Sequence, residues 1–265
     1  MKTAIVGFGN VGQAMYHIIK DKGVVSIYDK NLRHYSEPKV LLGSEIVFIC
    51  LPTPNHPSGE QDVSAFIDFF EYIEEVQHNE ASEWHPIFVI KSTILFDNLA
   101  PYLDKFRIVM NPEFLNQNSA FSDSQNQKIV ILGGHIDLLD KVEKFYVEQT
   151  CVEATYEYMS IKEAIDFKYI RNIYGAYKVL FWNWVQEQTG DARKMAELYN
   201  KLPQGEMSTV AADGKPGYGG ACFVKDVAAR HNEFPHELTA FMQNYNGRLR
   251  QIDKKMFLTP KLMKG

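Results

Sequence analysis

Short, largely apolar runs alternate with longer amphipathic stretches through the first half of the chain. Such runs are typical of strands in a parallel sheet whose two faces are both covered. Amphipathic stretches between them are typical of the helices that connect parallel strands. The pattern predicts strands over 2–6, 24–28, 46–50, 87–90, 108–110 and 129–132, and helices over 11–20, 64–77 and 136–147. This alternation predicts an α/β fold, a Rossmann-like doubly wound parallel sheet.

The pattern changes near residue 156, where the strand-like runs stop. One long amphipathic stretch over 160–188 follows, and shorter helical stretches come at 191–200 and 237–253. Helices without intervening strands favour a separate all-helical layer or domain. We therefore predict a Rossmann-like domain over 1–155 and a smaller all-helical domain over 156–265 that contains the long helix.

Composition narrows the class of protein. The 265 residues carry a net charge of -5, which argues against electrostatic binding of nucleic acid. No apolar run is long enough to predict a membrane span. The cysteines Cys50, Cys151 and Cys222 are too few and too scattered for a disulfide framework, so we expect a cytoplasmic protein. The histidines lack the spacing of metal ligands, and we expect no metal site.

A glycine motif follows the first predicted strand and opens the first predicted helix. It reads Gly7-Phe8-Gly9-Asn10-Val11-Gly12. The first glycine permits a tight turn, the second lets the backbone approach a diphosphate, and the third allows close packing of helix on strand. Amides at the helix start, including those of Asn10 and Val11, are suited to bind the diphosphate. The alternative is a flavodoxin-like fold in which this loop is a tight turn without a dinucleotide.

Asp29 lies at the end of the second predicted strand. In dinucleotide-binding domains a carboxylate here accepts hydrogen bonds from the adenosine ribose, and it repels the 2′-phosphate of NADP. This position therefore favours NAD as the cofactor. Lys30 and Arg33 weaken that preference, because their charges could pair with a 2′-phosphate.

Two further segments follow predicted strands. Pro52 and Thr53 come after the third strand, and Ser92 and Thr93 come after the fourth. Ligands in open α/β sheets bind at this carboxyl edge, where threonine can donate a hydrogen bond to a ribose or a nicotinamide. The alternative is that proline and threonine simply end the strands.

A cysteine lies in a glycine-rich segment, Gly217 to Asp226, which reads GYGGACFVKD. Lys225 would lower the pKa of the Cys222 thiol and favour the nucleophilic thiolate. Asp226, one helical turn beyond the cysteine, could act as a base or hold a water. The alternative is a buried structural cysteine beside a loop.

Polar residues interrupt the apolar face of the long predicted helix. Lys168 and Asn172 lie four residues apart, which places an amine beside an amide on one helix face. Such a pair could stabilise an oxyanion, or the lysine could reach the surface while the asparagine caps a loop. Glu113, after another strand, could be a general base or an acid that stabilises a helix start.

Taken together, these motifs resemble the UDP-glucose/GDP-mannose dehydrogenase family. The resemblance implies an NAD-dependent enzyme that oxidises the C6 alcohol of a nucleotide sugar of the UDP-glucose type to a carboxylate. The matching segments, in family order, are GFGNVG at 7–12, Asp29, LPTP at 51–54, Ser92-Thr93, NPEFL at 111–115, Lys168 with Asn172, and GYGGACFVKD at 217–226.

The resemblance also implies residue roles. Cys222 would attack the intermediate aldehyde and carry a thiohemiacetal and then a thioester, while Lys168 and Asn172 would stabilise the oxyanions. The remaining roles are water activation by Asp226, proton handling by Glu113 and Thr93, cofactor contact by Lys225, and substrate contact by Gly219, Phe114 and Leu115 in addition to Lys168 and Asn172.

The chain also departs from the family. We expect it to lack the C-terminal nucleotide-binding domain, and it has Gln117 and Val224 where the family has glutamate and proline. Two alternatives therefore stay open: a dinucleotide-binding protein without turnover that pairs with a relative, and a dehydrogenase of small hydroxy acids.

The long helix carries a second apolar stripe. In the family this helix forms the dimer core, so we expect a homodimer through 160–188; the alternative is packing of the stripe against the chain's own later helices. The stripe consists of Tyr169, Ile173, Tyr177, Leu180 and Trp184.

Overall fold

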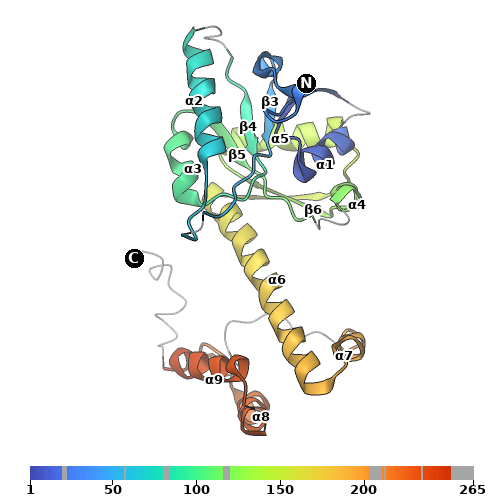
Figure 1. Ribbon diagram of the computed structural model, residues 1–265, viewed down its shortest axis with the longest axis vertical. Helices are drawn as coiled ribbons and strands as arrows, with labels where there is room; N and C mark the ends of the chain where they lie inside the picture. Colours follow the sequence, from blue (N-terminus) through green and yellow to red (C-terminus); the bar gives the residue numbers. More distant parts are fainter. Residues whose placement is uncertain are drawn as a thin grey trace. The chain divides into compact units, whose positions relative to one another are not determined.

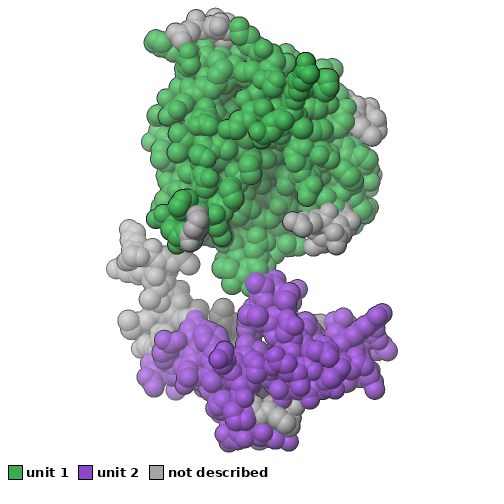
Figure 2. All heavy atoms as spheres, in the orientation of Figure 1, with its two compact units in different colours: residues 1–173 green, residues 174–265 purple. Residues whose placement is uncertain are grey.

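A computed structural model describes most of the chain. The described residues are 1–19, 23–56, 58–79, 84–115, 120–202, 211, 213–233 and 235–251. They form two compact units, Met1–Ile173 and Tyr174–Gly265 (Figures 1 and 2). The first unit contains the sheet and the second contains helices.

A seven-stranded sheet forms the centre of the first unit. Its strand order is β2-β1-β3-β4-β5-β6-β7, and the first five of these strands are parallel to one another. β6 runs antiparallel to β5 and parallel to β7. The strands are β1 (Lys2–Val6), β2 (Val24–Tyr28), β3 (Ile46–Ile49), β4 (Ile87–Ile90), β5 (Arg107–Met110), β6 (Ile129–Gly133) and β7 (Thr155–Met159).

Helices cover both faces of the sheet (Figure 1). Side chains of α2, α3 and the start of α6 pack on one face, and side chains of α1 and α5 pack on the other. Every residue of β3 and β4 is buried, which explains why these strands are continuously apolar. The helices of this unit are α1 (Asn10–Ile19), α2 (Ser64–Asn79), α3 (Phe96–Leu103), α4 (Ala120–Gln125) and α5 (Ile136–Gln149), with short 3-10 turns η1 (Arg33–Tyr35) and η2 (Pro38–Leu41).

The Rossmann-like sheet predicted from the sequence is confirmed, with differences in detail. The strand β7, which pairs with β6 at the edge of the sheet, was not predicted. Its sequence, TYEYM, has no continuous apolar run, and none of its residues is fully buried. The helices α3 and α4 were also not predicted. Lys20 and Asp253, where two predicted helices end, lie outside the described residues.

The long helix α6 (Ile161–Thr189) begins in the first unit. Ser160 and Glu163 form a capping box: the Ser160 hydroxyl accepts from the Glu163 amide at 3.2 Å, and Glu163 accepts from the Ser160 amide at 2.9 Å. Gly133 allows this helix to approach the sheet, because a Cβ there would lie 2.7 Å from the Ala164 Cβ. These contacts fix the first turns of α6 against β6.

In the part of the second unit that the structure describes, the remainder of α6 is followed by α7 (Ala192–Tyr199), α8 (Gly220–Glu233) and α9 (Glu237–Leu249). Asp191 caps α7 by accepting from the Lys194 amide at 3.0 Å. His236 caps α9, and its Nε2 lies 3.0 Å from the Glu187 carboxylate on α6. The compact units meet at Ile173/Tyr174 inside α6, whereas the domain boundary predicted near 155 precedes this helix.

None of the helices among the described residues combines the length and the hydrophobicity that a membrane crossing requires.

Candidate functional site

The glycine loop lies between β1 and α1. Gly7 has a φ of +85°, and a Cβ there would lie 2.6 Å from the carbonyl oxygen of Cys50. A Cβ on Gly12 would lie 2.0 Å from the Gly7 oxygen. A Cβ on Gly9 would meet nothing within 4 Å, so the backbone at this position borders open space. The loop therefore needs glycine at two positions for its own packing, and at the third it leaves room for a ligand.

Asp29 joins the glycine loop to the segment after β2. Its carboxylate accepts from the Phe8 amide at 2.8 Å and from the Asn31 amide at 2.9 Å. Each oxygen thus keeps acceptor capacity for the hydroxyls of a ribose. Lys30, which could have paired with a 2′-phosphate, has its ammonium 3.2 Å from the Asp68 carboxylate. This arrangement agrees with the preference for NAD predicted from Asp29.

Two neighbouring cavities open along this loop. The larger, of about 390 Å³, contains the glycine loop, Asp29, the segments after β3 and β4, and Glu113. The smaller, of about 290 Å³, is bounded by Asp29 and by apolar side chains of α2. Their sizes suit a ligand of several rings that spans both. Of the predicted cofactor residues, the larger cavity is lined by Gly7, Gly9, Asn10, Val11, Asp29, Pro52, Thr53 and Thr93.

The segments after β3 and β4 are tied together at Thr93. The Thr53 hydroxyl donates to the Thr93 carbonyl at 2.6 Å, and the Gln61 amide donates to the same carbonyl at 2.9 Å. The Gln61 side chain also accepts from the Leu95 amide at 3.0 Å and donates to the Tyr169 hydroxyl at 3.2 Å. Sequence reasoning missed Gln61, because a single glutamine in a loop shows no pattern. Its side chain connects its own loop to the segment after β4 and to α6.

Glu113 and Lys168 form a pair that connects the NPEFL segment to α6. The Lys168 ammonium lies 3.0 Å from the Glu113 Oε1 and also donates to the Glu113 carbonyl. The other carboxylate oxygen, Oε2, accepts from the Leu115 amide at 2.7 Å. Lys168 is 5% exposed, so the alternative of a lysine that reaches the surface is wrong. Phe114 packs beside this pair, with its ring centroid 5.5 Å from the ammonium.

Asn172, one helical turn beyond Lys168, is exposed in the first unit. Lys168 is buried and Asn172 is exposed, so a joint role of the two residues in stabilising an oxyanion stays a prediction. Gln117 lies outside the described residues.

Cys222 is the third residue of α8, in the second unit. This helix was not predicted as an element. The side chain of Cys222 lies outside the described residues. Lys225 and Asp226 are described and exposed, and the ammonium of the first lies 2.6 Å from the carboxylate of the second.

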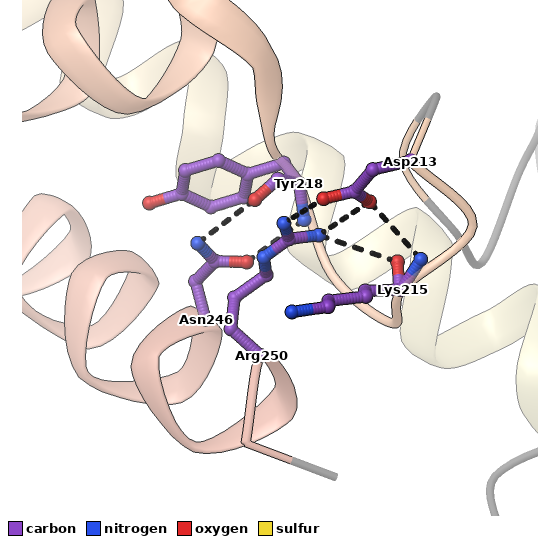
Figure 3. Close-up of polar contacts among 5 residues, drawn as sticks. All are labelled: Asp213, Lys215, Tyr218, Asn246 and Arg250. Carbon is purple, nitrogen blue, oxygen red and sulfur yellow. Dashed lines mark hydrogen bonds and ion pairs between the residues drawn. The ribbon is translucent and has the colours of Figure 1, made fainter. Parts of the chain in front are cut away.

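The segment before α8 is held by the last turns of α9 (Figure 3). The Asn246 side chain accepts from the Tyr218 amide at 2.8 Å and donates to the Tyr218 carbonyl at 3.0 Å. Arg250 donates to Asp213, and this bond is the first of several that lower the pKa of the Asp213 carboxyl. A Cβ on Gly219 would lie 3.1 Å from the Arg250 guanidinium. The glycine-rich approach to Cys222 is thus a hydrogen-bonded loop within the second unit.

The candidate residues therefore fall into two groups. The first unit gathers the cofactor residues with Thr93, Glu113 and Lys168, and the second unit contains Gly219, Cys222, Lys225 and Asp226. The convergence of the two groups stays a prediction.

The parallel sheet, the glycine loop, Asp29 and the cavity beside them define a dinucleotide-binding domain of the Rossmann type. Residues 19–149 of this chain match the family model "UDP-glucose/GDP-mannose dehydrogenase family, NAD binding domain". The resemblance drawn from the motifs is thereby confirmed, and NAD is the cofactor of this domain.

Curated relatives support this assignment. The chain is 29% identical over 202 residues to the UDP-glucose 6-dehydrogenase of Rickettsia bellii, which covers 71% of this chain and 45% of the relative. It is 27% identical over 216 residues to the GDP-mannose 6-dehydrogenase of Pseudomonas aeruginosa, which covers 72% of this chain and 47% of the relative. The chain thus spans about half the length of the curated relatives that it matches.

Solved structures share the fold. A crystal structure of a ternary complex of GDP-mannose dehydrogenase from Pseudomonas aeruginosa superimposes with a TM-score of 0.79 at 21% identity, covering 94% of this chain and 69% of that chain. A 3-hydroxyisobutyrate dehydrogenase from Mycobacterium tuberculosis superimposes with a TM-score of 0.55 at 14% identity, covering 97% of this chain and 99% of that chain.

Proposed function

We propose that the protein oxidises the C6 alcohol of a nucleotide sugar, of the UDP-glucose type, to the carboxylate, with NAD as the hydride acceptor in both oxidations. The observation that carries the proposal is the cavity that joins the glycine loop to Glu113, whose carboxylate is held by the buried ammonium of Lys168. The family relatives, named as UDP-glucose and GDP-mannose 6-dehydrogenases, support the substrate class.

In this proposal each residue has a defined chemical role. Glu113 and Thr93 take the proton of the C6 hydroxyl through a bound water while the alcohol becomes an aldehyde. The Cys222 thiolate then adds to the aldehyde carbon and forms a thiohemiacetal, whose oxyanion Lys168 and Asn172 stabilise.

Loss of a second hydride converts the thiohemiacetal to a thioester. A water oriented by Asp226 adds to the thioester carbon, the carbon–sulfur bond breaks, and the Cys222 thiolate leaves as the carboxylate forms. Covalent attachment retains the aldehyde between the two oxidations. Contacts from Gly219, Phe114 and Leu115 to the substrate, and from Lys225 to the cofactor, complete the proposed site.

We also propose that the protein is a homodimer through α6. Within this helix large apolar side chains are exposed in succession: Ile173 is 66% exposed and Leu180 is 62% exposed. Tyr177, on the same stripe, is 37% exposed. A stripe of this kind on a monomer marks a surface that another chain covers. Sedimentation at micromolar concentration tests this, and a monomer would contradict it.

The activity is tested by following NADH formation across a panel of nucleotide sugars, with a Cys222→Ser variant as the control. The proposal expects turnover by the unaltered protein and none by the variant. NAD binding in calorimetry without turnover of any nucleotide sugar would instead favour a binding protein that pairs with a relative.

A small hydroxy acid is included in the same panel. The fold shared with 3-hydroxyisobutyrate dehydrogenase over nearly the whole of that chain motivates this arm. Oxidation of an alcohol to a ketone needs no covalent trap, so hydroxy-acid turnover that survives Cys222→Ser would replace the proposed function with this second one.

A further inference from the structure

A buried lysine lines the cofactor cavity and is absent from the roles given above. Lys91 directly follows β4, at the carboxyl edge of the sheet, and is 5% exposed. It borders the cavity of about 390 Å³ together with Gly7, Gly9 and Asn10. These are the glycine-loop residues that are suited to bind a diphosphate.

The hydrogen-bond partners of Lys91 are uncharged. Its ammonium donates to the Asn111 Oδ1 at 2.9 Å and lies 3.4 Å from the Tyr146 hydroxyl. The Tyr146 hydroxyl itself donates to the same Asn111 oxygen at 2.6 Å, and the Asn111 amide donates to the Ile131 carbonyl at 2.8 Å. Among the residues that the structure describes, no carboxylate lies within 4.0 Å of the Lys91 ammonium. An asparagine and a tyrosine thus orient the cation without neutralising it.

Removing an ammonium from water without a counter-charge is unfavourable, and buried charges in proteins are generally paired. Desolvation accordingly lowers the pKa of Lys91 to about 8, whereas the nearby Cys50 and Glu113 act in the opposite direction and Lys168 acts in the same direction. Glu113 is already paired with Lys168 at 3.0 Å. An anionic ligand in the cavity would supply the negative counter-charge that the Lys91 ammonium lacks.

We propose that Lys91 is a cofactor-binding residue whose ammonium contacts the diphosphate of the dinucleotide. The proposal depends on the binding of NAD and not on the oxidation proposed above, so the two can fail separately. In this proposal the uncharged side chains of Asn111 and Tyr146 hold the Lys91 ammonium at the cavity, and the diphosphate of the ligand supplies its negatively charged partner.

The test uses ADP-ribose, which carries the diphosphate but no nicotinamide, and adenosine, which carries neither. Calorimetry compares the unaltered protein with Lys91→Met and with Lys105→Met. The control removes an exposed lysine whose ammonium lies 2.6 Å from Glu74. Because a charge-assisted contact contributes to binding, we expect Lys91→Met to lower the affinity for ADP-ribose by about tenfold. Adenosine affinity should stay unchanged in both variants, and Lys105→Met should bind ADP-ribose normally.

A second measurement, the pH dependence of ADP-ribose binding, is made first on the unaltered protein. In the unaltered protein the affinity for ADP-ribose should fall as the pH rises from 7 to 9, because Lys91 loses its proton near pH 8. The other charged or titratable groups around it are Cys50, whose pKa burial raises to about 12, Tyr146, whose pKa burial also raises, and Glu113, Lys168 and Asp29. Lys91→Arg, which stays charged, should remove this pH dependence while it retains affinity.

Three outcomes would overturn the proposal. The first is an unchanged ADP-ribose affinity in Lys91→Met together with a flat pH profile in the unaltered protein. The second is an equal loss of adenosine affinity, which would indicate a general disturbance of the site. The third is tighter NAD binding by Lys91→Met with unchanged ADP-ribose binding, which would place the cation beside the pyridinium ring instead.

Discussion

Replacing Lys168 by methionine tests how much the buried ion pair between Lys168 and Glu113 contributes to the stability of the protein. The Lys168 side chain is 6% exposed and the Glu113 side chain is 16% exposed, and their charged atoms lie 3.0 Å apart. Methionine fills a similar volume and has good helix propensity, so the helix and its packing on the sheet should persist. The change removes the ammonium and leaves the Glu113 carboxylate largely desolvated, with the Leu115 amide as its remaining donor.

The cost follows from this burial. Removing one partner of a buried ion pair typically destabilises a protein by 3–5 kcal/mol, and the partial exposure of Glu113 places this pair at the lower end, about 3 kcal/mol. In a compact unit of this size each kcal/mol lowers Tm by roughly 2–4 °C. We therefore expect Lys168→Met to lower the Tm of the first unit by about 6–12 °C.

Thermal unfolding followed by circular dichroism measures this shift, and the same helix supplies the control. Lys162 pairs with Asp166 at 2.7 Å, but these side chains are 52% and 41% exposed. An exposed pair of this kind contributes about 0.3–0.5 kcal/mol, so Lys162→Met should change Tm by about 2 °C or less.

A double variant that adds Glu113→Gln to Lys168→Met should recover part of the loss, because it removes the unpaired charge. Equal Tm values for Lys168→Met and Lys162→Met would refute the argument that the pair is buried and coupled.

Three further predictions concern other parts of the chain. Gly12→Ala should abolish NAD binding in calorimetry, since a Cβ there would lie 2.0 Å from the Gly7 oxygen; normal affinity would contradict the loop geometry. Asn246→Ala should increase amide hydrogen exchange in the segment before α8 by at least tenfold, since its side chain holds the backbone there at 2.8 and 3.0 Å; unchanged exchange would exclude that role. Iodoacetamide at pH 8 should modify the exposed Cys151 but leave Cys50 unmodified, because desolvation raises the pKa of Cys50 to about 12 and keeps the thiol protonated; equal modification would show that the Cys50 thiol ionises at this pH.

Much of the fold could be predicted because the central strands are buried on both faces. In β3 and β4 every position is apolar and buried, so the run itself identifies the strand. β7 gives no such run, because it lies at the sheet edge and alternates threonine and glutamate with aromatic residues. α3 is short and contains Pro101, which argues against a helix when the sequence is read alone.

The site was predictable where the chain is constrained locally. A Cβ at Gly7 or Gly12 would lie within 3 Å of backbone atoms, so both positions require glycine. The spacing of these glycines in the sequence therefore predicts the geometry of the loop. The pairing of Lys168 with Glu113 joins residues far apart in sequence, and helix periodicity relates Lys168 only to neighbours on α6. Lys91 was not predicted as a site residue. Its position directly after a fully buried strand is a signal that could have identified it, because the charge of a buried lysine requires a polar or anionic partner.

The number of NADH molecules formed per nucleotide sugar consumed tests the proposed chemistry most directly. An oxidation that passes through a thioester on Cys222 yields two NADH for each sugar carboxylate released. A protein that binds NAD but yields no NADH with any nucleotide sugar, or one that yields a single NADH and a free aldehyde, would contradict the account.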